Sequence, residues 1–364
     1  MEALSDPDWR VRRAAAEALG TFSRHGEKTV PGLLDLLHDP KSEVRSSAAI
    51  ALGKLGQKSP AVAQALEELG RNADPGTKLS VAIALTLLGK AEDDWIPFLI
   101  DAVGSPDEST AEASAMALRR LVAKKPEKLL AGILDVVKEA KEAQILRLLH
   151  VLRALGPFAH NALPRLEPFY DNLSIAGRTE LLSAFTAIDK EGDSAVRLLK
   201  RGVKSPEPDV RREALVGFLR YRSKSDLYLG SLMEALDDRD LKNRVITLRI
   251  LRGLSAKASE AVPKVLSATG DANPQVRTEA LKTLAALAKP DAEMVRICGQ
   301  RLSDRDQGVQ CAAVRTLQKV AVKEPDLVVP LLEEALKVEK QEKIRKCIGS
   351  ALQSIARKSG GPRG

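Results

Sequence analysis

The sequence is poor in the residue types that carry most catalytic and metal chemistry. Its 364 residues include only four histidines, three cysteines and 3% aromatic side chains. Cys298, Cys311 and Cys347 have no C-x-x-C spacing, which argues against a zinc site and a disulfide framework and fits a reducing compartment. No H-x-x-x-H pattern and no phosphate-binding glycine motif occurs. The sequence therefore predicts no metal, no cofactor and no catalytic residue.

Long apolar runs are absent as well. No stretch approaches the roughly 18 apolar residues that a membrane-spanning helix needs, and the opening string MEALSDPDWRVRR lacks the apolar core of a signal peptide. We therefore expect no membrane partner and a cytoplasmic location, provided that no upstream segment carries a signal. Apolar residues still make up 44% of the chain, which is enough to bury an extended core.

A repeat of about 33 residues runs through the sequence. The strings VRRAAAEALGTF, VRSSAAIALGKL, VRREALVGFLRY and VRTEALKTLAAL begin at residues 11, 44, 210 and 276. Counting eight positions on from the valine defines an anchor in every unit, at Leu19, Leu52, Leu85, Leu118, Leu152, Phe185, Phe218, Leu251, Leu284, Leu317 and Leu352. The intervals are 33 to 35 residues, which indicates a stacked repeat architecture.

Each unit is predicted to hold two helices. Around the anchor, apolar or small residues fall at −8, −5, −4, −1, 0 and +3, a stripe with the period of a helix, which we call helix B. A second apolar stretch about 20 residues upstream marks helix A, in which a proline recurs at Pro31, Pro97, Pro164, Pro263 and Pro330. Because proline removes a backbone donor and clashes with the preceding turn, it should bend the first turns of helix A.

An acid at −13, then V-R at −8 and −7, then A-x-A-L-G is the most specific part of the pattern. It resembles HEAT repeats, in particular the short bacterial kind found in phycobilisome lyase subunits. The resemblance covers residues 1–356 and implies an all-α, right-handed α-solenoid of about ten to eleven helical hairpins, with a flexible tail at residues 357–364. Met1–Leu4 matches the end of a helix A whose beginning is missing, so we expect repeat 1 to be incomplete and the chain to be a fragment.

Charged residues recur at two fixed positions of each unit. Acids at −13 and arginines at −7 match the Asp/Arg ladder of HEAT families. The acid is expected to cap helix B, and the arginine to reach an acid at the same edge or in the neighbouring unit. The ladder residues are Asp6, Arg12, Asp39, Arg45, Asp238, Arg244, Asp271 and Arg277. Ala111, Ile145 and Gln310 interrupt the arginine row, and the stack should be least regular between about 104 and 160.

Positions −6, −2 and +1 lie opposite the buried stripe and form the arc that a partner would meet, since B helices line the concave surface of HEAT solenoids. In repeats 2 to 5 this arc carries Ile50, Leu79, Ile83, Met116, Leu146 and His150. In repeats 7 to 11 it carries Arg212, Arg249, Arg252, Lys282, Arg315 and Lys346. Strong curvature of the stack would instead bury the apolar residues between neighbouring B helices, and both interpretations stay open.

The charge of the chain is unevenly divided. Residues 1–182 hold 23 basic and 25 acidic side chains, whereas residues 183–364 hold 34 and 24. We predict a non-enzymatic scaffold that binds a protein or peptide, of acidic character, along the B-helix surface. Nucleic-acid binding by the basic second half is the alternative, because phosphates require such cations. A lyase-like accessory subunit, suggested by the repeat type alone, is a third.

Overall fold

The computed structural model is built of helices over the part of the chain that it describes, residues 2–21, 26–56, 59–71, 73–90, 95–287 and 291–358. The helices follow one another in A and B pairs, which confirms the all-α fold and the solenoid of helical hairpins. None of the helices in these ranges has both the length and the apolar run that crossing a membrane would take. The chain divides into two compact units, Met1–Ser194 and Ala195–Gly364.

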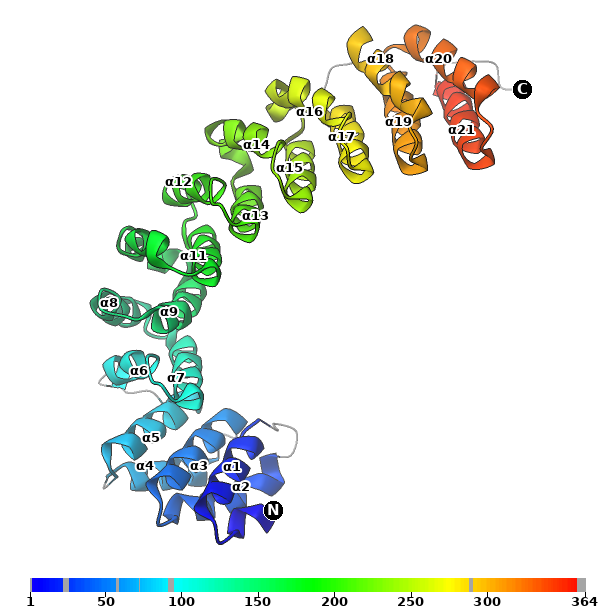
Figure 1. Ribbon diagram of the computed structural model, residues 1–364. Helices are drawn as coiled ribbons and strands as arrows, with labels where there is room; N and C mark the ends of the chain where they lie inside the picture. The colour runs from blue at the N-terminus through cyan, green and yellow to red at the C-terminus, as the bar shows by residue number, and fades with distance from the viewer. Residues whose placement is uncertain are drawn as a thin grey trace. The chain divides into compact units, whose positions relative to one another are not determined.

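The first unit contains the hairpins of repeats 1 to 6 (Figure 1). Helices α1, α3, α5, α7, α9 and α11 are its B helices, and the elements between them supply helix A. Its elements are η1 (Glu2–Ser5), α1 (Trp9–Leu19), α2 (Gly26–Asp35), η3 (Leu36–His38), α3 (Ser42–Leu55), α4 (Pro60–Arg71), α5 (Pro75–Leu87), α6 (Ile96–Ala102), α7 (Glu108–Leu121), α8 (Pro126–Val136), α9 (Glu142–Leu155), η5 (Gly156–Ala162), α10 (Leu163–Leu166), η6 (Glu167–Asn172) and α11 (Ile175–Ile188).

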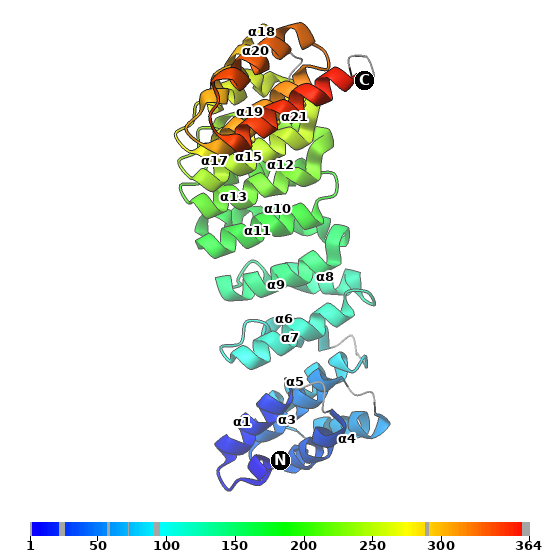
Figure 2. The same ribbon diagram turned by 90° about the vertical axis from the view of Figure 1, so that its right-hand side faces the viewer.

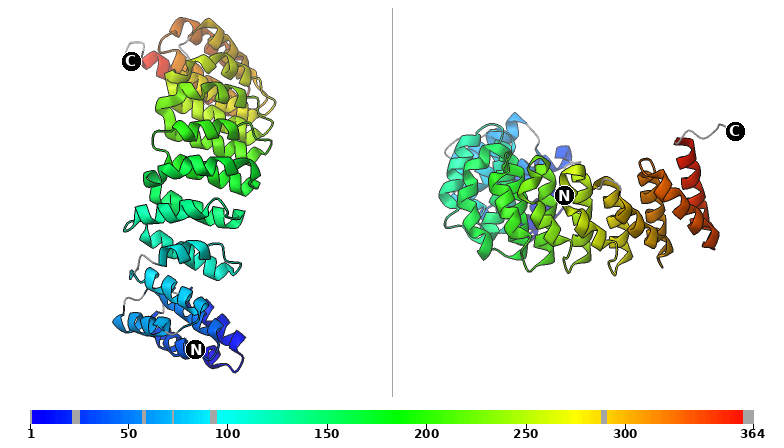
Figure 3. Two further views of the ribbon diagram at one scale, coloured as in Figure 1. Left: turned by 90° about the vertical axis from the view of Figure 1, so that its left-hand side faces the viewer. Right: turned by 90° about the horizontal axis from the view of Figure 1, so that it is seen from above.

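The second unit contains repeats 7 to 11, whose elements are α12 (Asp193–Gly202), α13 (Pro208–Gly217), η7 (Phe218–Leu227), α14 (Leu229–Ala235), α15 (Leu241–Leu254), η8 (Ser255–Ala261), α16 (Val262–Ala268), α17 (Pro274–Leu287), α18 (Ala292–Gln300), η9 (Arg301–Ser303), α19 (Gln307–Val320), α20 (Pro325–Val338) and α21 (Glu342–Lys358). Each helix B packs against the next, from α13 to α21 (Figures 1 and 2). The yellow-to-red helices stand side by side in the right-hand view of Figure 3.

Several B helices begin at a side-chain cap two residues after the −13 position, whereas Lys41 and Glu207 at the same position of α3 and α13 make no such bond. Asp8, Asp74, Asp107, Asp240 and Asp306 stand at −11 and accept backbone N–H groups of the first turn. The −13 acid lies outside the helix: Asp39 Oδ1 accepts the N–H of Lys41, and Asp238 Oδ1 that of Asp240. The predicted capping role of the −13 acid is therefore wrong, because that carboxylate closes the preceding turn and is held by an arginine.

The recurring proline marks the start of an α-helix in three repeats. Pro97, Pro164 and Pro263 stand in the first turn of α6, α10 and α16, where a missing N–H costs nothing. The segments before α10 and α16 are the 3-10 helices η5 and η8. The predicted bend thus takes the form of a change from 3-10 to α geometry in those two repeats, whereas Pro31 and Pro330 lie inside α2 and α20.

The two ends of the chain differ in part from expectation. Residues Glu2–Ser5 form the 3-10 helix η1, and Leu4 packs into the core of the first repeats. Residues 357 and 358 belong to α21, so the predicted tail begins too early; residues 359–364 lie outside the described residues. A single solenoid domain over residues 1–356, a missing first helix and a fragmentary chain stay predictions.

Small residues bring the first B helices close together. Gly20 and Gly53 both follow their anchors at +1, and a Cβ built on Gly53 would lie 2.6 Å from the Cα of Ala84 in α5. A Cβ on Gly20 would lie 2.9 Å from the Cα of Ala51 in α3. Helices α1, α3 and α5 therefore meet almost backbone to backbone, which needs glycine at these positions.

Candidate functional site

An arginine–aspartate ladder ties successive repeats together within each unit. Arg12 Nε lies 2.7 Å from Asp39 Oδ2, and its Nη1 donates to the backbone carbonyl of Asp6. The most buried rung joins Arg277 to Asp304 at 2.7 Å, with side chains 5% and 4% exposed. The same contact joins Arg211 to Asp238 and Arg244 to Asp271, whereas Arg45 makes one contact of 3.2 Å with Asp74, the cap of α5. Each arginine thus binds the aspartate of the next repeat and carbonyls of its own turn.

The electrostatics of the rungs keep the ladder acids ionised. Burial acts to raise the pKa of the Asp39, Asp238 and Asp304 carboxyls. Hydrogen bonds from the ladder arginines and from backbone N–H groups outweigh burial, so the pKa of each carboxyl lies below its ordinary value. The guanidinium groups are occupied by these acids, so we assign them a structural role.

The predicted apolar arc of repeats 2 to 5 is not a continuous exposed surface. Ile50 and Ile83 are 6% and 0% exposed, so their predicted exposure is wrong. The cause is the close approach of α1, α3 and α5, in which each helix covers the −2 residue of its neighbour. The alternative interpretation, burial of these residues between neighbouring B helices, therefore holds for Ile50 and Ile83. Met116 is 42% exposed, whereas Leu79 and Leu146 are half-buried.

His150 faces an acid that spacing along its own helix did not reveal. Its Nδ1 lies 3.5 Å from Glu180 Oε1, and Arg153 Nη1 lies 2.7 Å from the same oxygen. Glu180 belongs to α11, the next helix B. This group therefore joins two neighbouring B helices, and among the described residues it is not part of a metal-binding cluster.

The basic residues of the second unit surround one buried acid. Glu279 on α17 is 7% exposed, and its carboxylate contacts Arg252 Nη1 at 2.7 Å, Lys282 Nζ at 3.0 Å and Arg249 Nε at 3.8 Å. Burial acts to raise the pKa of Glu279, but Lys282 and Arg252 outweigh it, and the pKa is lowered. Three cations around one carboxylate leave a surplus of positive charge on α15 and α17.

The other predicted cations differ in availability. Arg212 is 25% exposed and is bound to Asp209 and Asp240 at the start of its own and the next helix B. Lys346 pairs with Glu342 on α21 at 2.6 Å. Arg315 on α19 is exposed, and within the described part of the chain it makes no ion pair. Arg315 is therefore the most available cation of this row.

Two exposed apolar residues extend the basic row, and neither was among the predicted residues. Val216 and Leu219 are 41% and 40% exposed, and they occupy positions −2 and +1 of repeat 7, as Arg249 and Arg252 do in repeat 8. Their position in the repeat was the signal that could have identified them. We define the B face of the second unit by these residues and the cations that follow: Val216, Leu219, Arg249, Arg252, Lys282 and Arg315.

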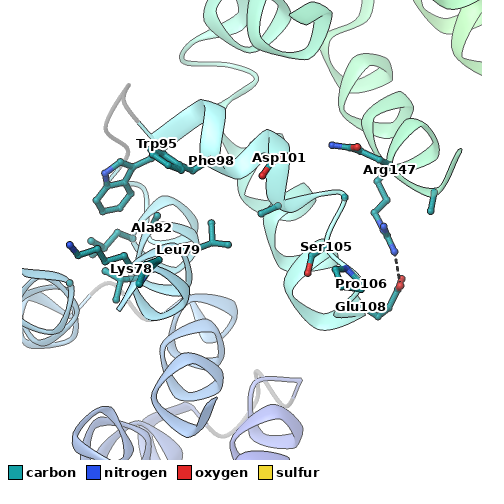
Figure 4. A pocket seen from close by; sticks show the side chains of 18 of the residues that line it. Lys78, Leu79, Ala82, Trp95, Phe98, Asp101, Ser105, Pro106, Glu108 and Arg147 are labelled. Atoms are coloured by element: carbon teal, nitrogen blue, oxygen red, sulfur yellow. Dashed lines mark hydrogen bonds and ion pairs between the residues drawn. The ribbon is translucent and has the colours of Figure 1, made fainter. Parts of the chain in front are cut away.

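The first unit contains an open groove between α4 and α5 on one side and α6 on the other (Figure 4). Its volume is about 1550 Å³, and it extends to the start of α9. The facing walls carry Lys78, Leu79 and Ala82 on α5, and Trp95, Phe98 and Asp101 at and along α6. Of the predicted partner-binding residues, Leu79 lines this groove. Trp95 and Phe98 were missed, although the string WIPF places two aromatic rings one helical turn apart.

The groove borders the irregular part of the stack. Repeat 5 has Ile145 in place of the ladder arginine, and it is held by other bonds: Arg147 Nη1 donates to Val103 O at 3.0 Å, and Gln144 Nε2 to Ile100 O at 3.3 Å. Helix α7 also packs less extensively against α9 than α3 does against α5. The irregular part was predicted from about residue 104 onward, whereas the groove begins one repeat earlier, at α4 and α5.

Comparisons with known proteins support a helical repeat fold. Residues 1–86 match the family model described as HEAT repeats. A search of curated proteins found no match. Among solved structures, Kap121p aligns with a TM-score of 0.54 and 15% identity over 98% of this chain and 50% of that chain. A chain of the AP-3 complex aligns with a TM-score of 0.62 and 14% identity over 98% and 70%.

A structure of Kap95p with RanGDP aligns with a TM-score of 0.54 and 14% identity over 98% of this chain and 56% of that chain. The chain thus spans about half the length of the Kap121p and Kap95p chains that it matches. The structural likenesses show a helical solenoid fold, and the family match confirms the HEAT-repeat resemblance over residues 1–86. The likeness to short bacterial, lyase-type repeats stays a prediction.

Proposed function

We propose that the protein is a non-enzymatic scaffold whose second unit binds an acidic, partly apolar segment of another protein along the B face. The observation that carries the proposal is the placing of Arg249, Lys282 and Arg315 at the same −2 position of three successive B helices. The Arg249 and Lys282 side chains remain 53% and 45% exposed, and Arg315 is exposed too. Such a row offers one cation per repeat to an elongated partner.

The spacing of the row sets the pattern of the partner. Packed helices lie about 8–10 Å apart. A chain in the polyproline II conformation advances about 3.1 Å per residue with three residues per turn, so every third side chain lies on the same side and meets the next helix B. A matching segment carries carboxylates at i, i+3 and i+6. An apolar residue three positions before the first carboxylate would face Val216 and Leu219. About ten residues suffice to cover α13 to α19.

Nucleic acid fits this surface less well than a protein segment. Phosphates of one strand recur about every 3.4 Å of duplex axis, so a row of cations about 10 Å apart meets only every third one. Single strands are held largely by aromatic stacking, and the B face as defined contains no aromatic ring. Val216 and Leu219 add apolar area, which a phosphate backbone does not use.

Similar solenoids have been seen with protein partners. Structures of Kap121p bound to RanGTP and to Pho4p align with this chain at TM-scores of 0.55 and 0.52. The absence of catalysis is also part of our proposal. Burial raises the pKa of the Cys298 thiol to about 12, so this cysteine is a poor nucleophile at neutral pH. A cytoplasmic location remains a prediction.

The test uses a fluorescent peptide of about ten residues with one leucine followed by glutamates at three-residue spacing. We expect Arg249→Glu and Lys282→Glu each to weaken its binding about two- to thirtyfold, because each turns an exposed attraction of about 0.2–1 kcal/mol into a repulsion. Val216→Asp should weaken it as well. Lys257→Glu, an exposed change on η8 that is not part of the B face, is the control with the same charge difference.

A second control is a peptide of identical composition with its glutamates in one block, which should bind more weakly. If Lys257→Glu weakened peptide binding as much as Arg249→Glu and Lys282→Glu do, the peptide would be held only by the general positive charge of the second unit. Nanomolar binding of a DNA or RNA oligonucleotide that is unaffected by Val216→Asp would replace the scaffold with a nucleic-acid-binding protein. Either result contradicts the proposed function.

A further inference from the structure

We propose that the groove of the first unit is a second docking site, and that its occupant is an amphipathic α-helix of a partner protein with acidic side chains along one edge and basic side chains along the other. This site is separate from the B face and does not depend on it. It lies within the first unit, between helices of repeats 3 and 4, and reaches repeat 5.

The groove leaves one side of helix α6 uncovered. Helix α6 packs tightly against α8 on one side, where a Cβ built on Gly132 would lie 2.6 Å from Ile100 Cδ1. On its other side, Trp95 and Phe98 face α5 across the open groove (Figure 4). Phe98 is 66% exposed. In a regular stack each helix A packs on its neighbours, so this side of α6 is a place where a further helix can pack.

The size of the groove suits a short helix. A helix about 10 Å across takes roughly 120 Å³ per residue, so the volume of about 1550 Å³ matches about 13 residues, between three and four turns. Sites for small molecules are commonly about 300–1000 Å³, which is smaller. The apolar side chains of Leu79, Ala82 and Phe98 on the facing walls fit a helix that presents apolar side chains at i, i+3 or i+4, and i+7.

The walls carry opposite charges, and these define the two edges of the partner helix. Arg71 and Lys78 line the side formed by α4 and α5, whereas Asp101 and Glu139 line the side toward α6 and α9, where Lys141 before α9 offsets one of these acids. Among the described residues these five side chains form no ion pair with one another or with others. A partner helix is therefore held best when its acidic edge faces Lys78 and its basic edge faces Asp101.

Two further pairs in the groove are already neutralised. Lys90 lies 3.0 Å from Glu67, and Arg147 pairs with Glu108 (Figure 4). These two ion pairs make the rim of the groove polar but contribute no net charge. The charge that a partner meets is thus set by the five side chains without ion pairs: the α4 and α5 wall is positive, and the opposite wall keeps a negative surplus because Asp101 and Glu139 outnumber Lys141. This difference favours one arrangement of the helix edges over the other.

The experiment uses a synthetic helical peptide of about 13 residues with leucines at i, i+4 and i+7, glutamates on one flank and lysines on the other. Binding is followed by Trp95 fluorescence in a Trp9→Phe background, since Trp9 and Trp95 are the only tryptophans. We expect a saturable blue shift, and Phe98→Asp should weaken binding at least about tenfold. Phe158→Asp is the matched control, because Phe158 is 65% exposed on η5 outside the groove.

The edge arrangement is tested by exchanging the two flanks of the peptide. The exchanged peptide should bind the wild-type chain more weakly, and the double variant Lys78→Glu, Asp101→Lys should prefer it. Equal binding to Phe98→Asp and Phe158→Asp, or an unchanged flank preference in the double variant, would overturn the proposal. So would a dimer, seen by sedimentation, that Phe98→Asp abolishes and Phe158→Asp leaves intact, because the occupant would then be a second copy of this chain.

Discussion

The ion pair between Arg277 and Asp304 is the most buried rung of the ladder. The guanidinium donates to both carboxylate oxygens of Asp304, at 2.9 and 2.7 Å, and to the backbone carbonyls of Asp271 and Ala272, at 2.9 and 3.1 Å. Arg277→Ala removes all four hydrogen bonds. Asp304, whose side chain is 4% exposed, then keeps only the N–H of Asp306 at 3.0 Å and Arg301 at 3.9 Å.

The expected cost follows from what remains around the carboxylate. Removing one partner of a buried ion pair costs about 3–5 kcal/mol when the remaining charge is uncompensated. Because Asp304 retains one backbone donor and a more distant arginine, we expect about 2–4 kcal/mol for Arg277→Ala. That corresponds to a roughly 30- to 700-fold change in the local opening equilibrium.

Amide hydrogen exchange is the suitable assay, because stacked repeats open locally rather than in one step. Protection factors in α17 and α19 of the full chain should fall by this factor. Arg45→Ala is the control, because it removes the same kind of carbonyl bonds, to Asp39 and Pro40, but strands no buried acid: its contact with Asp74 is a single one of 3.2 Å between side chains 22% and 42% exposed. Loss of that ion pair should cost about 1 kcal/mol or less.

A double variant separates the cost of the stranded Asp304 charge from a general loss of structure in α19. Adding Asp304→Asn to Arg277→Ala removes the stranded charge, so part of the protection should return. If Arg277→Ala costs no more than Arg45→Ala, or if the double variant recovers nothing, buried charge pairing does not hold α17 to α19.

Three further predictions concern acid stability, helix packing and the B face. Because the pKa of ladder carboxyls such as Asp238 is lowered in the folded state, the unfolded chain takes up protons first as the pH falls. The free energy of unfolding should therefore be steady above about pH 5 and decline as the pH drops through the ordinary value of about 3.9; a urea midpoint unchanged between about pH 6 and pH 3 would refute this. Gly53→Ala would stabilise an isolated helix by about 1 kcal/mol, but here the new Cβ meets the Cα of Ala84 at 2.6 Å, so we expect a loss of about 1–3 kcal/mol and a lower thermal midpoint, and a higher one would contradict the packing argument. Glu279→Gln releases cations of the B face and should tighten binding of the glutamate peptide about two- to fivefold in an anisotropy titration, whereas weaker binding would assign Glu279 a positioning role.

The solenoid was predictable from the sequence because its determinants are local. The stripe at −8, −4, −1, 0 and +3 fixes the buried side of each helix B, and the period fixes the order of the hairpins. The −7 arginine and −13 acid recur because each pair bridges two units, as Arg12 and Asp39 do. Such features repeat with the period, so one chain displays them many times.

The candidate sites were less predictable because they depend on neighbouring helices. Ile50 and Ile83 occupy positions that face outward on an isolated helix, but the glycines of adjacent repeats let the next helix cover them. The partner of His150 belongs to α11, 30 positions along the chain. The groove at Phe98 exists because α6 stands apart from α4 and α5. The sequence of a single helix does not determine its distance from a neighbouring helix.

The central claim is that the B face of the second unit binds an acidic protein segment. The most direct measurement is hydrogen–deuterium exchange of the full chain with and without the spaced-glutamate peptide at saturation. We expect exchange to slow in α13, α15, α17 and α19 and in η7 at Leu219, with α16 and α18 unchanged. Unchanged exchange in those B helices at saturation, or slowing produced equally by the blocked-glutamate peptide, would contradict the claim.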